Sequence, residues 1–167
     1  HLPGNTKRVE DIKEPIEIDQ VIIGSCTNGR LEDLEIAASI LKGHTGGCGD
    51  YALSVYPGSQ PIMMELVRTG VIGELMASGA TIRTAFCGPC FGAGDVPANG
   101  ALSIRHTTRN FPSREGSKPG SGQLSGVALM DARSIAATTA NGGILTPATD
   151  IDYDPTVPEY QYDASSY

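Results

Sequence analysis

Apolar residues along the chain follow two spacings, one typical of buried strands and one typical of helices. Residues 16–24 (IEIDQVIIG) combine alternation with a β-branched run and end at a glycine, so they predict a buried strand. In residues 28–43, apolar side chains recur at helical spacing, acidic residues occupy the first turn and Gly43 ends the segment, which predicts a helix.

The remainder of the chain continues this alternation of strands and helices. Ser59 and Asp131 each precede a predicted helix and are residue types typical of N-caps. Such an alternation predicts an α/β fold with a mostly parallel sheet and helices on its faces. Further strands are predicted at residues 51–58, 80–86, 101–108 and 127–130, and further helices at residues 59–79, with a break at Gly70, and at residues 132–141.

Both ends of the chain lie outside this pattern. Residues 1–15 are predicted to be a linker, and residues 151–167, which are acidic and contain prolines, an extended tail. Residues 16–150 are left as one predicted domain, which suits a chain of 167 residues. Because the chain starts in a linker and without Met, we expect it to be a piece of a longer protein.

Composition narrows the classes of function. The net charge of −7 disfavours a nucleic-acid partner. No apolar run approaches the ~20 residues that a membrane span needs. Nothing in the sequence indicates secretion, so the four cysteines are expected to be reduced, in a cytoplasmic protein.

Three of the cysteines lie where predicted strands end. Cys26 follows the first strand in GSCTNGR, and Cys87 and Cys90 follow the third in AFCGPCFGAG. The carboxyl ends of parallel strands share one edge of a sheet, where sites form, so the thiols should meet there. Cys48 lies in a separate glycine-rich loop and is expected to be only an exposed thiol.

These thiols suit three kinds of chemistry. CGPC is the sequence of a thioredoxin-type dithiol, but the glycine-rich residues after it disfavour the helix that lowers the pKa of the first thiol. A structural zinc site needs four ligands, with His106 or Cys48 as the fourth, and usually two short-spaced pairs. An iron–sulfur cluster with one open iron needs only three thiolates, which fits the count. The open iron would act as a Lewis acid that helps a hydroxyl leave.

Three motifs in one order, IGSCTNGRLED, CGPCFG and TRNFPSREG, resemble the aconitase superfamily, which includes isopropylmalate dehydratase large subunits and homoaconitases. The resemblance covers residues 16–150 and implies a three-layer α/β/α domain that carries the cluster ligands of these enzymes. It also implies a hydro-lyase that dehydrates and rehydrates a hydroxy di- or tricarboxylic acid.

The same resemblance implies roles for five residues. Cys26, Cys87 and Cys90 fall on the family's ligands of a [4Fe–4S] cluster. Arg109 and Arg114 fall on its substrate-binding arginines, in keeping with the ability of a guanidinium fork to hold a carboxylate bidentately. They lie at the start of a long irregular loop, a feature that compact domains usually keep for function.

The resemblance also indicates what is missing from the chain. Family members draw a base and further substrate ligands from other domains, so no catalytic residue is assigned here and those domains are the expected partners. Thr108 replaces an asparagine common in the family, and His44 and His106 receive no role. A CGPC dithiol oxidoreductase and a cluster-bearing regulatory or RNA-binding relative remain alternatives, the latter disfavoured by the acidic charge.

Overall fold

The computed structural model describes residues 3–46, 51–113, 118–157, 159–161 and 165. Within these ranges it contains a five-stranded sheet in which every pair of neighbouring strands is parallel. The predicted α/β class is therefore confirmed. In the order in which they lie in the sheet, the strands are β3 (Thr81–Ile82), β2 (Ala52–Tyr56), β1 (Gln20–Gly24), β4 (Leu102–Arg105) and β5 (Gly126–Leu129).

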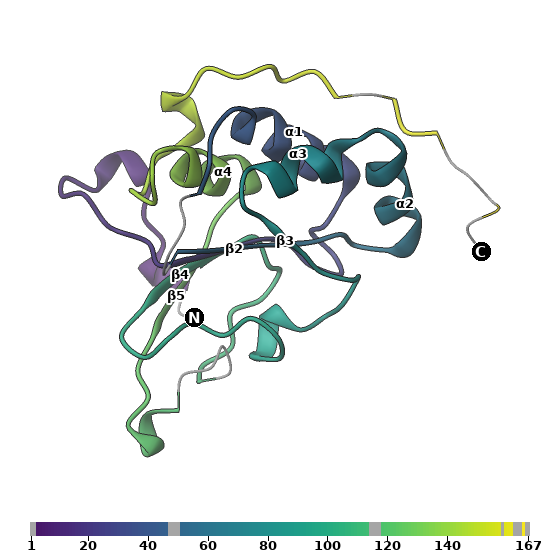
Figure 1. Cartoon of the computed structure of the whole chain (residues 1–167). Coiled ribbons are helices and arrows are strands. Elements are labelled where there is room, and N and C mark those ends of the chain that lie inside the picture. The colour runs from purple at the N-terminus through teal and green to yellow at the C-terminus, as the bar shows by residue number, and fades with distance from the viewer. Residues whose placement is uncertain (1–2, 47–50, 114–117, 158, 162–164, 166–167) are drawn as a thin grey trace.

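The α-helices of the described chain lie together on one face of the sheet (Figure 1). An irregular segment with a single 3-10 turn, η3 (Pro89–Phe91), lies on the other face, so the arrangement has three layers. The helices are α1 (Leu31–Leu41), α2 (Gln60–Arg68), α3 (Val71–Ala77) and α4 (Ala132–Ala140).

The local signals in the sequence act as predicted. The Ser59 hydroxyl accepts a hydrogen bond from the N–H of Ile62, and the Asp131 carboxylate accepts one from the N–H of Ser134 at 2.9 Å. The strand predicted over residues 80–86 is shorter than expected. Beyond Arg83, whose N–H donates to the carbonyl of Val55 at 2.9 Å, the chain leaves the sheet to form an irregular loop.

Side chains alternate between the two faces of each strand. On the face that packs against the helices they are apolar, and Val21, Val55 and Ile104 are buried in one cluster with helix residues such as Leu34 and Ile135. The opposite face carries mostly polar side chains that are also buried. These are Gln20, Ser54, Ser103 and Arg105.

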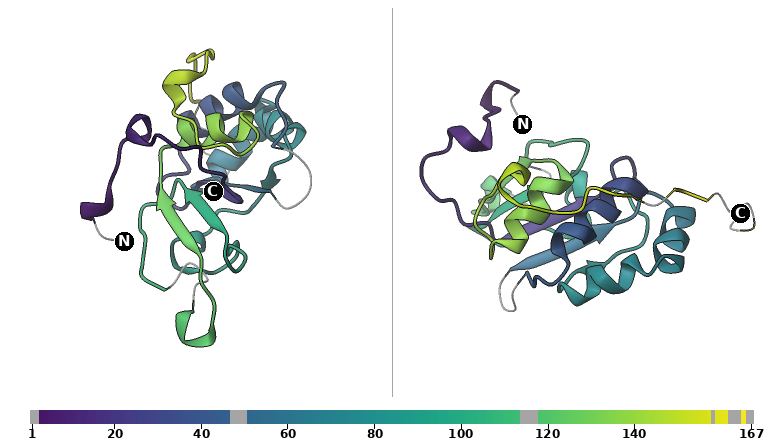
Figure 2. Two further views of the ribbon diagram at one scale, coloured as in Figure 1. Left: turned by 90° about the vertical axis from the view of Figure 1, so that its left-hand side faces the viewer. Right: turned by 90° about the horizontal axis from the view of Figure 1, so that it is seen from above.

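The segments at the two ends of the chain pack against this body. Glu17 and Ile144 form an antiparallel bridge, and Ile151 and Tyr153 are partly buried against the core cluster. Residues 154–157 run across the helices, where the Ser39 hydroxyl donates to the carbonyl of Asp154 at 2.8 Å (Figure 2). No helix in the described ranges has both the length and the apolar composition needed to cross a membrane.

Candidate functional site

The predicted site residues gather at the edge of the sheet where the parallel strands end. Cys26 follows β1, Cys87 and Cys90 follow β3, and Arg109 follows β4. The strand order places β1 beside β4, so the first and third motifs lie on adjacent strands. Arg114, the second predicted carboxylate ligand, and Cys48 lie outside the described residues.

The three described cysteines are free thiols in one electrostatic environment. Cys26 and Cys87 are exposed, whereas the Cys90 side chain is 4% exposed. A hydrogen bond with Cys26 raises the pKa of the Cys87 thiol, and burial and the charges of Cys26 and Cys90 raise it further, while the Arg109 guanidinium lowers it. Residues from all three motifs therefore act on the same thiol.

The loop that carries Cys26 is fixed by close backbone packing. Its Gly29 N–H donates to the carbonyl of Ser25, and the Gly58 N–H donates to the carbonyl of Gly29, both at 2.8 Å. A Cβ atom at Gly29 would lie 2.3 Å from the carbonyl oxygen of Tyr56, so only glycine fits there. The chain turns sharply at this point and presents Cys26 at the sheet edge.

The loop that carries the other two thiols, defined here as the cysteine loop (residues 83–95), has its own tight turn. The N–H groups of Phe91 and Ala93 both donate to the carbonyl of Gly88 at 3.1 Å. Between Cys87 and β4, where every residue is described, the chain forms the 3-10 turn η3 and no α-helix. A thioredoxin-type dithiol needs a helix and a lowered thiol pKa, and Cys87 has neither.

The two ends of the cysteine loop are joined by a hydrogen-bonded ion pair. The Arg83 guanidinium donates to the Asp95 carboxylate through Nε, at 3.2 Å, and through Nη2. The Tyr56 hydroxyl donates to the same carboxylate at 2.6 Å. Burial alone would raise the pKa of Asp95, but hydrogen bonds from Tyr56, Arg83 and Ser54 outweigh it and lower the pKa. Burial and the neighbouring Asp95 raise the pKa of Tyr56 to about 12.

Arg105 lies between the sheet and the cysteine loop and holds the middle of the loop. Its side chain is 0% exposed, and Nη1 donates to the carbonyl of Pro89 at 2.7 Å. Nη2 donates to the Gln20 side chain at 3.2 Å and to the carbonyl of Asp95 at 3.4 Å, and Nε donates to the Ser103 hydroxyl at 3.0 Å. One guanidinium thus joins two strands to two points of the loop.

Inspection of the sequence missed the residues that hold the cysteine loop, Arg83, Asp95 and Arg105. The signal for Arg105 is its place in LSIR, where polar residues alternate with apolar ones. Such alternation in a strand indicates that one face is polar. It does not say that the polar face is buried.

Arg109 is exposed and lies in a segment that contacts the first motif. The Thr108 hydroxyl donates to the side-chain oxygen of Asn28, which belongs to the SCTN sequence, at 3.4 Å. The Asn110 side chain donates to the carbonyl of Val127 on β5 at 3.1 Å. The guanidinium is therefore free to reach a ligand while the backbone beneath it is anchored on both sides.

The described residues contain no group of three His, Cys, Asp or Glu side chains that could hold a single metal ion. His106, a candidate zinc ligand, lies within the fields of Asp33 and Asp131, and burial lowers its pKa. A cluster binds each cysteine through a different iron, so its ligands lie farther apart than those of a single ion. The three described thiols, with the Arg109 guanidinium beside Cys87, match the number of thiolates that a cluster with one open iron needs.

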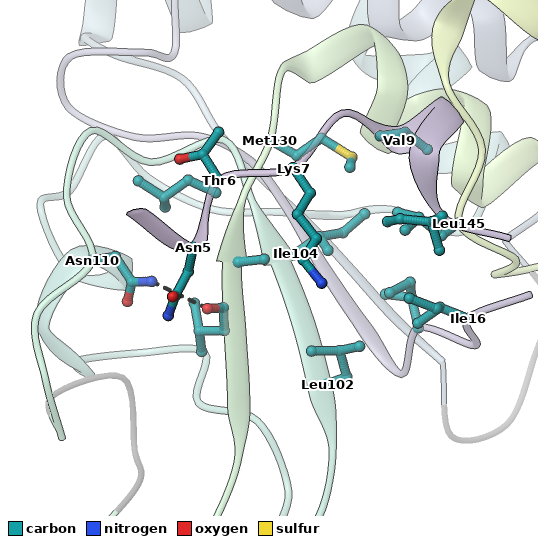
Figure 3. A pocket seen from close by; sticks show the side chains of 15 residues that line it. Asn5, Thr6, Lys7, Val9, Ile16, Leu102, Ile104, Asn110, Met130 and Leu145 are labelled. Carbon is teal, nitrogen blue, oxygen red and sulfur yellow. Dashed lines mark hydrogen bonds between the residues drawn. The ribbon is translucent and has the colours of Figure 1, made fainter. Parts of the chain in front are cut away.

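A cavity of about 520 Å³ lies elsewhere, between the segment after Asn5 and strands β4 and β5 (Figure 3). Its walls are mainly apolar, with Ile16, Leu102 and Leu145 among them, and the ammonium of Lys7 points into it. None of the three described cysteines lines this cavity, and neither does Arg109. The cavity is thus separate from the cysteine site.

Comparisons of the chain with a family model and with known proteins point to the same family. The family model described as "Aconitase family (aconitate hydratase)" matches residues 4–137. The chain is 41% identical over 152 residues to the 3-isopropylmalate dehydratase large subunit of Clostridioides difficile, an alignment that covers 90% of the chain and 34% of that protein. It is 43% identical over 148 residues to the 2,3-dimethylmalate dehydratase large subunit of Eubacterium barkeri, covering 88% of the chain and 34% of that protein. The chain therefore spans about a third of the length of these relatives.

Proposed function

Because the chain belongs to the aconitase family, we propose that it is the cluster-binding part of a hydro-lyase that removes water from, and adds it to, a hydroxy dicarboxylic acid. The supporting observation is the meeting of three distant motifs at one thiol, Cys87, which is hydrogen-bonded to Cys26 and lies in the field of Arg109. In this proposal residues 16–150 form the cluster domain of a cytoplasmic enzyme, flanked by a linker (1–15) and a tail (151–167).

The proposed ligands of a [4Fe–4S] cluster are Cys26, Cys87 and Cys90. When bound, a cluster with one iron not ligated by the protein supplies a Lewis acid for the substrate hydroxyl. The role of the chain is to hold three thiolates together in spite of their mutual repulsion. In the metal-free protein a hydrogen bond with Cys26 and burial raise the pKa of the Cys87 thiol, the charges of Cys26 and Cys90 add to this, and the nearby guanidinium of Arg109 offsets part of it.

Arg109 and Arg114 are the proposed carboxylate ligands. The Arg109 side chain is exposed beside the thiols, so it can orient an acid whose hydroxyl faces the cluster position. A guanidinium offers two parallel N–H groups to one carboxylate. Two such residues suit a substrate with more than one carboxylate.

Alkyl-substituted malates are the proposed substrate class. The relatives described above are named for 3-isopropylmalate and 2,3-dimethylmalate, which both carry a malate backbone with apolar substituents. The catalytic base would come from another part of the enzyme. The chain covers only about a third of its relatives, which leaves room for the remaining domains or subunits that would be its partners.

The cofactor assignment is tested by replacing each cysteine in turn. After anaerobic reconstitution with iron and sulfide, Cys26→Ser, Cys87→Ser and Cys90→Ser should each lower the bound iron and the visible absorption of the full-length protein. Cys48→Ser is the matched control and should leave both unchanged. Loss of the cluster in Cys48→Ser alone would show that the ligand set is wrong.

The substrate assignment is tested by Arg109→Lys in the full-length enzyme. Lysine keeps the charge but loses the planar fork. A charged hydrogen bond is worth about 1.5–3 kcal/mol, so kcat/KM should fall roughly 10- to 100-fold. The assay uses 3-isopropylmalate, 2,3-dimethylmalate and aconitate, with iron content measured in parallel and expected to be normal. Arg68→Lys, on helix α2, is the control, and an equal fall in both variants would exclude Arg109 as a substrate ligand.

A further inference from the structure

We propose that Arg105 is a positioning residue that fixes Cys90 for cluster binding before any cluster is present. The assignment of Cys90 as a ligand rests on the proposed function, whereas the contacts of Arg105 belong to the metal-free chain. Arg105 is fully buried beneath the cysteine loop, on the polar face of the sheet.

The contact that carries this proposal is the hydrogen bond from Arg105 Nη1 to the carbonyl of Pro89, at 2.7 Å. The peptide unit that joins Pro89 to Cys90 is planar. Holding its oxygen therefore also holds the direction of the bond that leads to the Cα atom of Cys90. Cys90 is 4% exposed, while Cys87, on the other side of the turn, is exposed.

The geometry of the other contacts explains why an arginine is required. Nη2 reaches the carbonyl of Asp95, at the end of the loop, and the side chain of Gln20 on β1, while Nε reaches Ser103 on β4. These acceptors come from separate elements and surround a planar donor group. A lysine ammonium has its three donors on one atom and cannot span them. A buried charge also requires such satisfied contacts, which makes the arrangement hard to loosen.

The ends of the cysteine loop are also held by side-chain contacts that do not involve Arg105. The Arg83 guanidinium binds the Asp95 carboxylate, which also accepts a hydrogen bond from Tyr56. Residues 83 and 95 therefore stay together even if the middle of the loop is released. Loss of Arg105 should free the turn around Cys90 without unfolding the loop or the sheet.

The consequence for the cofactor is preorganisation. A ligand that is already ordered loses less conformational entropy on binding than a mobile one. With Arg105 in place, one of the three thiols starts in a fixed position. Without it, a cluster would have to order the turn when it binds, and would be lost more readily.

The test measures the reactivity of each cysteine in metal-free, full-length protein under anaerobic conditions. A pulse of iodoacetamide followed by peptide mass spectrometry reads Cys26, Cys87 and Cys90 separately. In the wild type, Cys90 should react more slowly than Cys87. Arg105→Met should raise the rate at Cys90 roughly 10-fold or more, the scale of losing a charged hydrogen bond, and leave the rate at Cys87 unchanged. Arg105→Lys should raise it by an intermediate factor, which keeps the test decisive if the methionine variant does not fold.

A core variant separates positioning from general destabilisation. Ile135 is buried in the core cluster, on the face of the sheet opposite to the cysteine loop, so Ile135→Ala should open a cavity there and lower the melting temperature. Its Cys90 should react at the wild-type rate. The proposal is overturned if Ile135→Ala exposes Cys90 as strongly as Arg105→Met does, or if neither Arg105 variant changes the rate at Cys90.

The rate of cluster loss provides the second measurement. After reconstitution, the visible absorption of Arg105→Met should decay roughly 10-fold faster than that of the wild type, in proportion to the change at Cys90. If Arg105 slows the reaction of Cys90 but the protein binds no iron, the positioning role stands and the proposed cofactor is refuted. A bound cluster whose loss rate is the same with and without Arg105 would refute the positioning role alone.

Discussion

The two faces of the sheet are built from the same strands but differ in chemistry. Towards the helices, alternate residues such as Val21, Val55 and Ile104 are apolar and packed in the core cluster. Towards the cysteine loop, the intervening residues include Ser103 and Arg105, which are equally buried but hydrogen-bonded. Both faces exclude water, and they do so by different means.

This difference separates stability from positioning. Burial of apolar surface is favourable in any orientation, so the helix face supplies free energy without specifying exact atomic positions. Hydrogen bonds depend on distance and angle, so the loop face places the residues that carry the thiols. We therefore expect substitutions on the helix face to act on global unfolding, and substitutions on the loop face to act locally.

The largest effect on global stability should come from Leu34→Ala on the helix face. Leu34 is 0% exposed in α1, and removal of such a side chain costs about 2–5 kcal/mol. Urea denaturation should show this loss, while the thiol reactivity of Cys90 under native conditions stays unchanged. If Cys90 reacted much faster in Leu34→Ala under conditions where the variant is still fully folded, the two faces would not be independent.

A smaller and more local effect should follow from Tyr56→Phe on the loop face. This variant removes a hydrogen bond to the Asp95 carboxylate, worth about 1.5–3 kcal/mol. Tyr51→Phe is the matched control, because it removes the hydrogen bond of Tyr51 with the hydroxyl of Thr139 on α4, worth about 0.5–1.5 kcal/mol. Amide hydrogen exchange in the cysteine loop should speed up in Tyr56→Phe alone. Equal exchange in both variants would contradict the local role of the Tyr56–Asp95 contact.

The smallest effect should be a difference in pH dependence. The folded state lowers the pKa of Asp95, so its carboxylate contributes stability above its unfolded pKa of about 4, and this is lost as the pH falls through the folded pKa. Burial raises the pKa of Glu35 on α1, so its contribution has the opposite sign and is lost as the pH rises through the folded value. Asp95→Asn should reduce the loss of stability that the protein shows as the pH falls below about 4. Glu35→Gln should reduce the loss of stability that the protein shows as the pH rises above that value. The measurement is the urea midpoint of each variant from pH 3 to 7, about the range over which both carboxyl groups titrate. If both variants changed the pH dependence of the midpoint in the same way, the opposite signs assigned to Asp95 and Glu35 would be wrong.

Much of this molecule was predictable because local signals decide it. Hydrophobic spacing identified the strands and helices, and the caps at Ser59 and Asp131 are formed as expected. The motifs also placed Cys26 and Cys87 at strand ends, and parallel pairing then brings them to one edge. The length of β3 was overestimated, because the chain leaves the sheet after Arg83, whose side chain pairs with Asp95.

The sequence by itself determined the class of fold, the elements and the cysteine motifs, because each depends on residues close together in the chain. Only the tertiary structure decided that β4 lies beside β1, which brings Arg109 to the thiols. It also decided that Arg105 is buried under Pro89. A charged residue in a strand has no local signal that distinguishes an exposed face from a buried one. That distinction depends on which distant segment covers the face, and hydrogen-bond partners far apart in sequence meet only when the chain has folded.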